Sequence, residues 1–153
     1  KLPQFAYSFT GYSQPYVKAS GREMNISPKT AREICNSIKG KMIPQAREYL
    51  EDVMDKKQPV PFRRYKKKVG HRSGLIGFHV GRYPEKAAEQ ILEIIDNLEN
   101  NGDFKGMDTE RMKIIHASAI RGRQVKMFKP RAFGRSSPSH NTLVHIELAA
   151  TEV

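Results

Sequence analysis

The sequence has little cysteine and no long apolar run. Its single cysteine, Cys35, cannot form a disulfide within the chain of 153 residues, and such sparse usage is typical of reducing compartments. No segment approaches the roughly 20 apolar residues that cross a bilayer, and residues 1–16 contain no apolar core of a signal peptide. We therefore expect a cytoplasmic protein with no membrane span.

The sequence also lacks the patterns that carry catalytic or metal chemistry. None of its five histidines has a cysteine partner or metal-binding spacing. Residues 70–74 lack the Lys-Ser/Thr ending of a phosphate-binding loop. Cys35 falls on the apolar face of a predicted helix, where a buried thiol is far more common than a nucleophile. We expect no metal, no cofactor and no enzymatic activity.

Acidic residues are missing from two long segments. The chain has 27 Lys+Arg against 16 Asp+Glu, a net charge of +11. Residues 56–72 hold eight Lys/Arg and residues 121–140 hold six, with no acid in either, whereas residues 84–111 hold eight Asp/Glu. Like charges at this density repel one another unless a polyanion neutralises them. The pattern predicts a nucleic-acid partner.

Aromatic, glycine and proline residues are interspersed in both basic segments. Phe62 and Tyr65 lie in the first segment, and Phe128 and Phe133 lie in the second. Aromatic rings can stack on unpaired bases, and glycine permits close backbone approach. These residues add to the prediction of a nucleic-acid partner.

Hydrophobic periodicity and punctuation predict three helices and at least three strands. Ser27 and Pro28 are suited to the N-cap and first position of the first helix. We expect the following elements in order: a strand over 16–24, a helix ending near Gly40, a helix opening at Pro44, a long loop over 59–82, a helix from Pro84 to Asn101-Gly102, and strands over 112–127 and 142–153.

The last two predicted strands are joined by a long connection. In the final strand, Val144, Ile146 and Leu148 alternate with His145 and Glu147, so one face points to the core and the other points away from it. Residues 121–140 between the strands are basic and far longer than a tight turn. If the strands pair, this connection projects as a hairpin arm that needs a partner to order it.

Three stretches give the chain a family resemblance. These are NISPKTAREICNSIKGK at 25–41, ERMKIIHASAIRGR at 110–123 and KMFKPRAFGRSSP at 126–138, followed by strand residues 142–147. Their order and spacing resemble the large-subunit ribosomal proteins numbered twenty-two in bacteria and seventeen in eukaryotes. Residues 53–82 depart from the bacterial pattern and are similar to the insertion of archaeal and eukaryotic members. The resemblance covers about residues 16–153.

The resemblance implies a fold and an assembly. The fold is α+β, with a small antiparallel sheet packed with three helices and a long, extended, basic β-hairpin. The expected domains are an N-terminal tail over 1–15, which could also be a surface wrap, and a ribosomal domain over 16–153, with a basic insertion at 56–82 and a hairpin arm at about 121–140. The partners are large-subunit ribosomal RNA, neighbouring ribosomal proteins and the nascent peptide, because the arm lines the exit tunnel in this family and the domain sits near the tunnel exit. No homo-oligomer is expected.

The candidate binding residues follow from the basic segments and the resemblance. Basic side chains neutralise phosphates, and arginine adds forked donors and stacking. The expected rRNA-binding residues are Arg121, Arg123, Lys126, Lys129, Arg131, Arg135, His140, Arg63, Arg64, Lys66, Lys67, Lys68, His71, Arg72, Lys29 and Arg32. The expected tunnel-facing tip consists of Met127, Phe128, Pro130, Phe133 and Gly134. A small local cluster is the alternative for the two phenylalanines.

Three other functional classes remain open from the residues alone. A free-standing RNA- or DNA-binding module shares the same charge pattern. An RNA-cleaving enzyme needs an acid/base constellation that the sequence does not display. A protein that binds anionic membranes needs amphipathic basic helices, which the two basic segments do not form.

Overall fold

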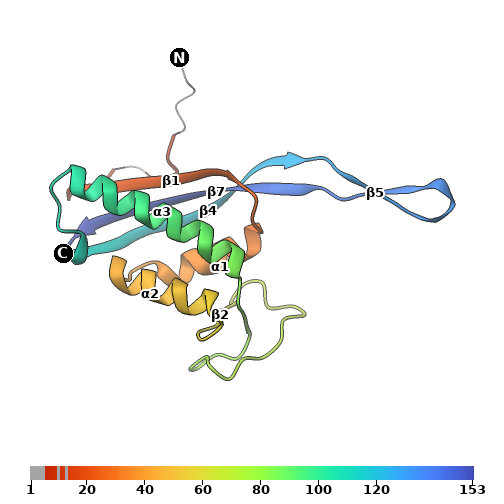
Figure 1. Cartoon of the computed structure of the whole chain (residues 1–153), viewed down its shortest axis with the longest axis horizontal. Helices are drawn as coiled ribbons and strands as arrows, with labels where there is room; N and C mark the ends of the chain where they lie inside the picture. The colour runs from red at the N-terminus through yellow and green to blue at the C-terminus, as the bar shows by residue number, and fades with distance from the viewer. Residues whose placement is uncertain (1–5, 10, 13) are drawn as a thin grey trace, which may run out of the picture.

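The computed structural model describes residues 6–9, 11, 12 and 14–153. One sheet carries three helices on one face, and a narrow hairpin extends far beyond this two-layer body (Figure 1). This confirms the expected α+β class. The elements are β1 Tyr16–Met24, α1 Pro28–Ile38, α2 Ile43–Met54, β2 Val60–Pro61, β3 Gly81–Arg82, α3 Glu85–Phe104, η1 Thr109–Arg111, β4 Met112–Val125, β5 Phe128–Pro130, η2 Ala132–Gly134, β6 Ser136–Pro138 and β7 Asn141–Glu152.

The main sheet is antiparallel, with the strand order β1-β7-β4. Strand β7 is therefore central, although it comes last in the chain. It pairs with β4 from Met112 opposite Glu152 to Val125 opposite Asn141. This register carries the pair beyond the end of β1, whose last pairing joins Met24 to Val144. The strands that build the sheet thus also build the base of the arm.

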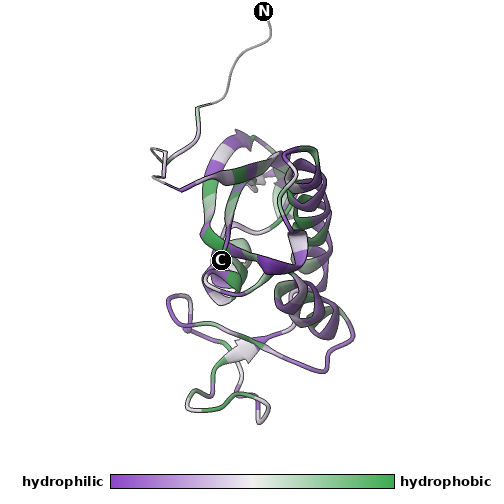
Figure 2. Ribbon diagram, turned by 90° about the vertical axis from the view of Figure 1, so that its left-hand side faces the viewer, coloured by the Kyte–Doolittle hydropathy of each residue, from purple (hydrophilic) through white to green (hydrophobic). Residues whose placement is uncertain are grey.

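The core lies between the sheet and the helices. Alternate β7 residues Val144, Ile146 and Leu148 are fully buried, as the sequence pattern predicts. Ile91 and Ile95 of α3 are also fully buried, and each buried aliphatic side chain contributes about 1.5–3 kcal/mol. Figure 2 shows the helices stacked against one face of the sheet, with apolar residues on the inner side. Cys35 of α1 is part of this core and is 1% exposed, which confirms the expectation of a buried thiol.

The expected end of the third helix is wrong. Helix α3 continues through Asn101 and Gly102 to Phe104, and Gly106, with φ +70°, lies two residues beyond the last helical residue. Gly102 is buried within the helix because a Cβ there would lie 2.7 Å from Met112 Cε. The glycine allows close packing of α3 on β4 rather than ending the helix. Gly40, with φ +86°, does follow α1 as expected.

The start of α1 agrees with the expectation in position. Pro28 is its first residue and Ser27 is its N-cap, but the Ser27 side chain makes no capping hydrogen bond. Instead, the Thr30 hydroxyl donates to the Ser27 carbonyl at 2.9 Å. The serine hydroxyl therefore does not satisfy the first N–H groups of the helix.

The second face of the sheet is covered by the segment that precedes β1. Glu147 points away from the helices as predicted, yet it is only 1% exposed. Its carboxylate accepts hydrogen bonds from the Ser8 N–H at 2.9 Å and the Ser8 hydroxyl at 2.6 Å, and pairs with Arg22 at 3.1 Å. The Phe9 ring packs on His116, with 4.6 Å between the ring centroids. The predicted tail therefore covers the sheet in its described part, while residues 1–5, 10 and 13 lie outside the described residues.

The expectation of a plain loop over 59–82 is wrong at its ends. Strands β2 and β3 pair through Val60 opposite Arg82 and Pro61 opposite Gly81. Phe62 is 3% exposed and belongs to the core, so this ring does not meet bases. The sequence shows no periodicity here because each strand has only two residues.

Candidate nucleic-acid interface

The arm begins where the main sheet loses its third strand. Beyond the β4–β7 pair, β5 and β6 continue the hairpin through Phe128 opposite Pro138 and Pro130 opposite Ser136. The Ser139 N–H donates to the Met127 carbonyl at 2.6 Å, which links the two pairs. Figure 1 shows the arm projecting from the body with no helix beside it. This confirms the expected long hairpin.

The arm presents its charge to solvent. The chain contains no acidic residue between Arg111 and Glu147. The six basic residues of the arm are exposed, and none forms an ion pair with a residue that the structure describes: Arg121, Arg123, Lys126, Lys129, Arg131 and Arg135. A hairpin of this charge is suited to contact with phosphates along its length.

The tip of the arm has a distinctive backbone. Phe133 has φ +58° and ψ +36°, and Gly134 follows with φ +66°. A positive φ is unusual for a bulky residue and stores strain. The Arg131 N–H donates to the Arg135 carbonyl at 2.8 Å, closing the turn. Phe133 is 98% exposed, which excludes the alternative of a local cluster for this ring.

The other side chains of the predicted tip are also exposed. Met127 is 53% exposed and Phe128 is 66% exposed. The Phe128 ring contacts His140 in a T-shaped arrangement, with ring centroids 6.3 Å apart. Pro130 ends β5 and is exposed. The arm therefore displays apolar groups among its cations, which suits contact with unstacked bases.

A buried carboxylate anchors the basic insertion. Glu33 of α1 is 1% exposed, and its oxygens accept hydrogen bonds from the backbone N–H groups of Arg63, Arg64 and Tyr65, at 3.3, 2.9 and 3.0 Å. Hydrogen bonds to an ionised group are the strong ones. Because the Glu33 carboxylate accepts from the backbone of Arg63 and Arg64, it does not bind their guanidinium groups. Both side chains are exposed. Sequence reasoning missed Glu33, because nothing local distinguishes it from a solvated helical acid.

Helix α1, the insertion and the base of the arm meet at one basic surface. One hollow of about 400 Å³ lies between the start of α1 and the insertion, and its lining includes Lys29, Lys66 and Lys67. A neighbouring hollow of about 390 Å³ includes Arg32 and Arg121. Arg64 and Tyr65 line both hollows, and no acid lines either. Residues from three separate parts of the sequence are thus brought together.

Tyr65 is placed among these cations. Lys29 Nζ lies 5.8 Å from the centroid of its ring, and the Arg64 guanidinium carbon lies 5.9 Å from it. Such contacts hold a cation near the ring face. We call the surface formed by Lys29, Arg32, Arg64, Tyr65, Lys66, Lys67 and Arg121 the basic groove.

Several expected site residues lie outside the basic groove. Lys68, His71 and Arg72 line neither hollow, although all three are exposed. His71 packs on His79, and the Arg72 guanidinium carbon lies 5.5 Å from the centroid of the Tyr83 ring. These residues form a separate part of the insertion surface.

His140 lies elsewhere as well. With Asn25 and Lys86 it lines a third hollow, at the start of β7. The structure thus distributes the candidate residues over the arm, the basic groove and the outer insertion.

Sequence reasoning omitted one basic residue of the groove region. Arg82 lines the same hollow as Lys66 and Lys67, and its guanidinium donates to the Lys68 carbonyl at 3.1 Å. Its place at the end of the predicted basic insertion could have identified Arg82 as a candidate from the sequence.

Acidic side chains gather on α2 and α3. Arg47 of α2 pairs with Asp96 and Glu99 of α3. The hydrogen bond that Arg47 donates to the Asp96 carboxylate is the main cause that raises the Arg47 pKa. The exposed Glu89 and Glu93 lie on the same helix. None of these acids lines the hollows of the basic groove.

The described residues include no group of three or more His, Cys, Asp or Glu side chains placed to hold a metal ion. Within the same part of the chain, no helix is long and apolar enough to cross a membrane.

A model of a known family matches most of the chain. The family is described as "Ribosomal protein L22p/L17e", and the match spans residues 19–151. The chain belongs to this family. The L22p/L17e membership confirms the resemblance drawn from the three motifs, and it favours a structural ribosomal protein over an RNA-cleaving enzyme.

Individual relatives agree with the L22p/L17e assignment. The chain is 50% identical over 152 residues to the large ribosomal subunit protein uL22 of Cenarchaeum symbiosum, covering 99% of each chain. It is 46% identical over 153 residues to that of Nitrosopumilus maritimus, covering 99% of this chain and 100% of the relative. The protein of Archaeoglobus fulgidus is 50% identical over 134 residues, which cover 88% of this chain and 86% of the relative. The similarity to archaeal members includes the insertion at 56–82.

Proposed function

We propose that this chain is a structural constituent of the large ribosomal subunit and works by binding ribosomal RNA in the cytoplasm. Membership of the L22p/L17e family supports this role. The observation that carries the proposal is the arm: an exposed hairpin with six cations and no acid, which nothing in the described chain neutralises. Such an arm gains its order and its counter-charge from a polyanion.

The finer proposal assigns parts of the interface. The arm binds rRNA phosphates through its basic residues, and its tip, from Met127 to Gly134, lines the exit tunnel beside the nascent peptide. The globular domain sits near the tunnel exit against neighbouring ribosomal proteins. The exposure of Met127, Phe128 and Phe133 at the far end of the hairpin supports this placement, since only a partner can cover them.

The basic groove and the outer insertion form the second rRNA surface. Contact is made by shape and backbone, because side chains do not enter the deep groove of A-form RNA. The partners of this surface are phosphates presented across α1, the insertion and the base of β4. If about 6–10 phosphates are contacted, affinity falls on the order of 10³–10⁵-fold between low and physiological salt.

Sedimentation tests the proposal. Tagged full chain is expressed in its host, and large subunits are washed in high salt and separated on a gradient. We expect the chain to remain with large subunits. A version without residues 126–136 keeps a four-residue loop between the paired Val125 and Asn141, and it should be retained less well. A full chain that runs free of ribosomes contradicts the proposal and favours a free-standing RNA-binding module.

A further inference from the structure

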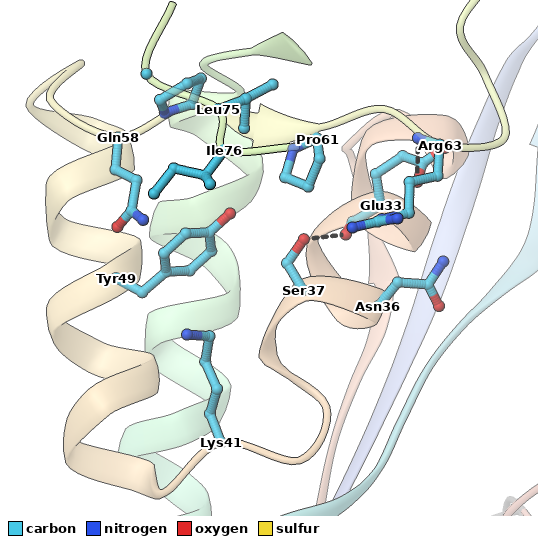
Figure 3. A pocket seen from close by; sticks show the side chains of 12 residues that line it. Glu33, Asn36, Ser37, Lys41, Tyr49, Gln58, Pro61, Arg63, Leu75 and Ile76 are labelled. Carbon is cyan, nitrogen blue, oxygen red and sulfur yellow. Dashed lines mark hydrogen bonds between the residues drawn. The ribbon is translucent and has the colours of Figure 1, made fainter. Parts of the chain in front are cut away.

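A further hollow on the molecule has a different character from the basic groove. It has a volume of about 370 Å³ and lies between α1, α2 and the insertion (Figure 3). Residues from all three elements line it, including Ser37 of α1, Tyr49 of α2, and Pro61 and Ile76 of the insertion. Its volume is near the lower end of the roughly 300–1,000 Å³ found for small-molecule sites. We call it the Tyr49 cleft.

The Tyr49 hydroxyl is a buried polar group that points into this cleft. Tyr49 is 7% exposed, and its hydroxyl makes no hydrogen bond with any residue that the structure describes. Figure 3 shows the phenol directed from α2 towards Ile76 and Pro61. The nearby Ser37 hydroxyl donates its own proton to the Glu33 carbonyl at 2.9 Å. A buried polar group without a partner needs an explanation, and a ligand is one.

Burial raises the pKa of the Tyr49 phenol above its ordinary value, which already leaves a tyrosine neutral. At physiological pH the group is therefore protonated and can donate one hydrogen bond and accept another.

The rest of the lining combines apolar, amide and cationic groups. Ile76 is fully exposed at the mouth, and Pro61 forms part of the wall. Asn36 and Gln58 bring side-chain amides, while Lys41 and Arg63 bring positive charge. The carboxylate of Glu33, the one acid in the lining, is already occupied by backbone N–H groups. The cleft is thus suited to a ligand with a flat apolar body, a polar edge and a negative charge.

We propose that the Tyr49 cleft binds one unstacked nucleotide of ribosomal RNA. The base lies against Pro61 and Ile76, and its polar edge meets the Tyr49 hydroxyl and the amides of Asn36 and Gln58. Its phosphate is held by Lys41 and Arg63. Proteins read RNA most specifically at bases that leave the stack, so this site adds base recognition to an interface that otherwise contacts phosphates.

A nucleotide fits this cleft better than a peptide does. A neutral peptide can satisfy the tyrosine but leaves Lys41 and Arg63 without a counter-charge. The cleft also shares Arg63 with the insertion that carries the second rRNA surface, so RNA bound there passes its mouth. The inference rests on the proposed function, since it requires that the chain bind ribosomal RNA.

Chemical footprinting tests the inference. Full chain is bound to deproteinised large-subunit rRNA, and the Watson–Crick edges of the bases are probed with dimethyl sulfate and a carbodiimide. We expect the wild-type chain to protect one unpaired base that becomes reactive again with Tyr49→Phe and with Ile76→Ser. Loss of one neutral hydrogen bond should weaken binding by about 2- to 10-fold.

The variants are chosen so that a lost protection cannot be explained by misfolding. Tyr49→Phe removes only a hydroxyl without a partner, so it should not lower thermal stability, and Ile76 is too exposed to affect folding. Phe104→Ser is the matched control, because Phe104 is 94% exposed at the end of α3, outside the cleft. This control should leave the protected base unchanged.

The outcomes separate the two proposals. If the wild-type chain shows no salt-sensitive binding to rRNA, the proposed function fails and the inference fails with it. If binding persists but both cleft variants protect the same bases as wild type, only the inference is wrong. Phe104→Ser exposing the same base as the cleft variants would also overturn it.

Crosslinking in assembled large subunits provides an independent test. A photoreactive group on Ser73→Cys stands beside Gly74 in the cleft lining. The label goes to the introduced thiol, because Cys35 is buried and burial raises its pKa to about 12. A crosslink to the protected nucleotide supports the inference. A crosslink to a protein shows that a peptide occupies the cleft and overturns it.

Discussion

Two buried carboxylates each hold a segment of backbone to the body. Glu33 binds the insertion through three N–H groups. Glu147 binds the segment before β1 through Ser8 and also pairs with Arg22 of β1. Both are 1% exposed. In a chain with an excess of cations, these two acids act within the fold rather than at its surface.

Replacing Glu33 with glutamine should destabilise the insertion. The amide retains one oxygen but turns an N–H₂ group towards backbone donors, and leaving such buried groups unsatisfied costs about 1–3 kcal/mol. We expect the free energy of unfolding, measured with urea, to fall by that amount, and hydrogen exchange at residues 63–65 to accelerate. Glu48→Gln on the exposed face of α2 is the control. Unchanged exchange at 63–65 would show that Glu33 does not anchor the insertion.

Glu147 should make stability depend on acid pH. Burial alone would raise its pKa, but the hydrogen bonds from Ser8 and the charge of Arg22 outweigh burial, and the folded pKa is lowered from the ordinary 4.5. A lowered folded pKa stabilises the fold above the unfolded value, and the contribution is lost as pH falls through the folded value. We expect the melting temperature of wild type to fall more steeply below pH 4.5 than that of Glu147→Gln.

The control for this titration lies on the same strand. Glu152 is exposed at the end of β7, and Glu152→Gln should retain the wild-type acid dependence. If the melting temperature of wild type and of Glu147→Gln fell equally with pH, the Ser8 contact would not favour the ionised form of Glu147 over the protonated form.

At the scale of elements, the arm is nearly independent of the core. From Arg123 to Ser136 every residue is exposed, so the arm contributes little to the burial that stabilises the body. Its pairing continues that of β4 and β7 through a register shift between Arg121 and Gln124, and β5 and β6 extend it further. Changes to the arm should therefore leave the stability of the body unchanged.

Charge removal on the arm should change the salt dependence of binding without changing stability. The triple substitution of Lys129, Arg131 and Arg135 by glutamine removes up to three phosphate contacts. Each contact contributes about 0.7–0.9 to the slope of log affinity against log salt, so we expect the slope to decrease by about 2–3. The melting temperature should stay the same. A slope equal to that of wild type would show that these side chains do not meet phosphate.

At the scale of the whole molecule, charge is segregated. No acid lines the hollows of the basic groove, and the sequence of the arm contains none. By contrast, α2 and α3 carry the exposed Glu48, Glu89 and Glu93. Segregation of this kind orients a protein on a polyanion, because only one surface is attracted. The net charge alone would not predict an orientation.

Matched charge changes on the two surfaces should therefore differ in effect. Arg64→Gln with Lys66→Gln removes two charges from the basic groove and should reduce rRNA affinity about 10-fold or more at low salt. Glu89→Gln with Glu93→Gln removes two acids from α3 and should change affinity by less than about 2-fold, since screening limits distant charges. Filter binding measures both. Equal effects from the two pairs would contradict an oriented contact.

The sequence by itself determined the elements with strong local signals. The apolar stripe of α3 and the alternation of Val144, Ile146 and Leu148 predicted the core faces, because burial imposes the helix and strand periods directly. Two acid-free segments predicted the polyanion partner, and motif order predicted the family. The predicted end of α3 at Gly102 was wrong, because the local sequence does not distinguish a glycine needed for close packing from one that ends a helix.

Only the tertiary structure decided which distant residues meet. Arg64 and Arg121 are 57 positions apart, yet they line one hollow because α1 lies between the insertion and the base of β4. The burial of Glu33 and Glu147 and the free hydroxyl of Tyr49 likewise follow from packing. Local sequence carries the period of an element, but a site built from separate elements depends on how their faces pack, and that depends on the whole chain.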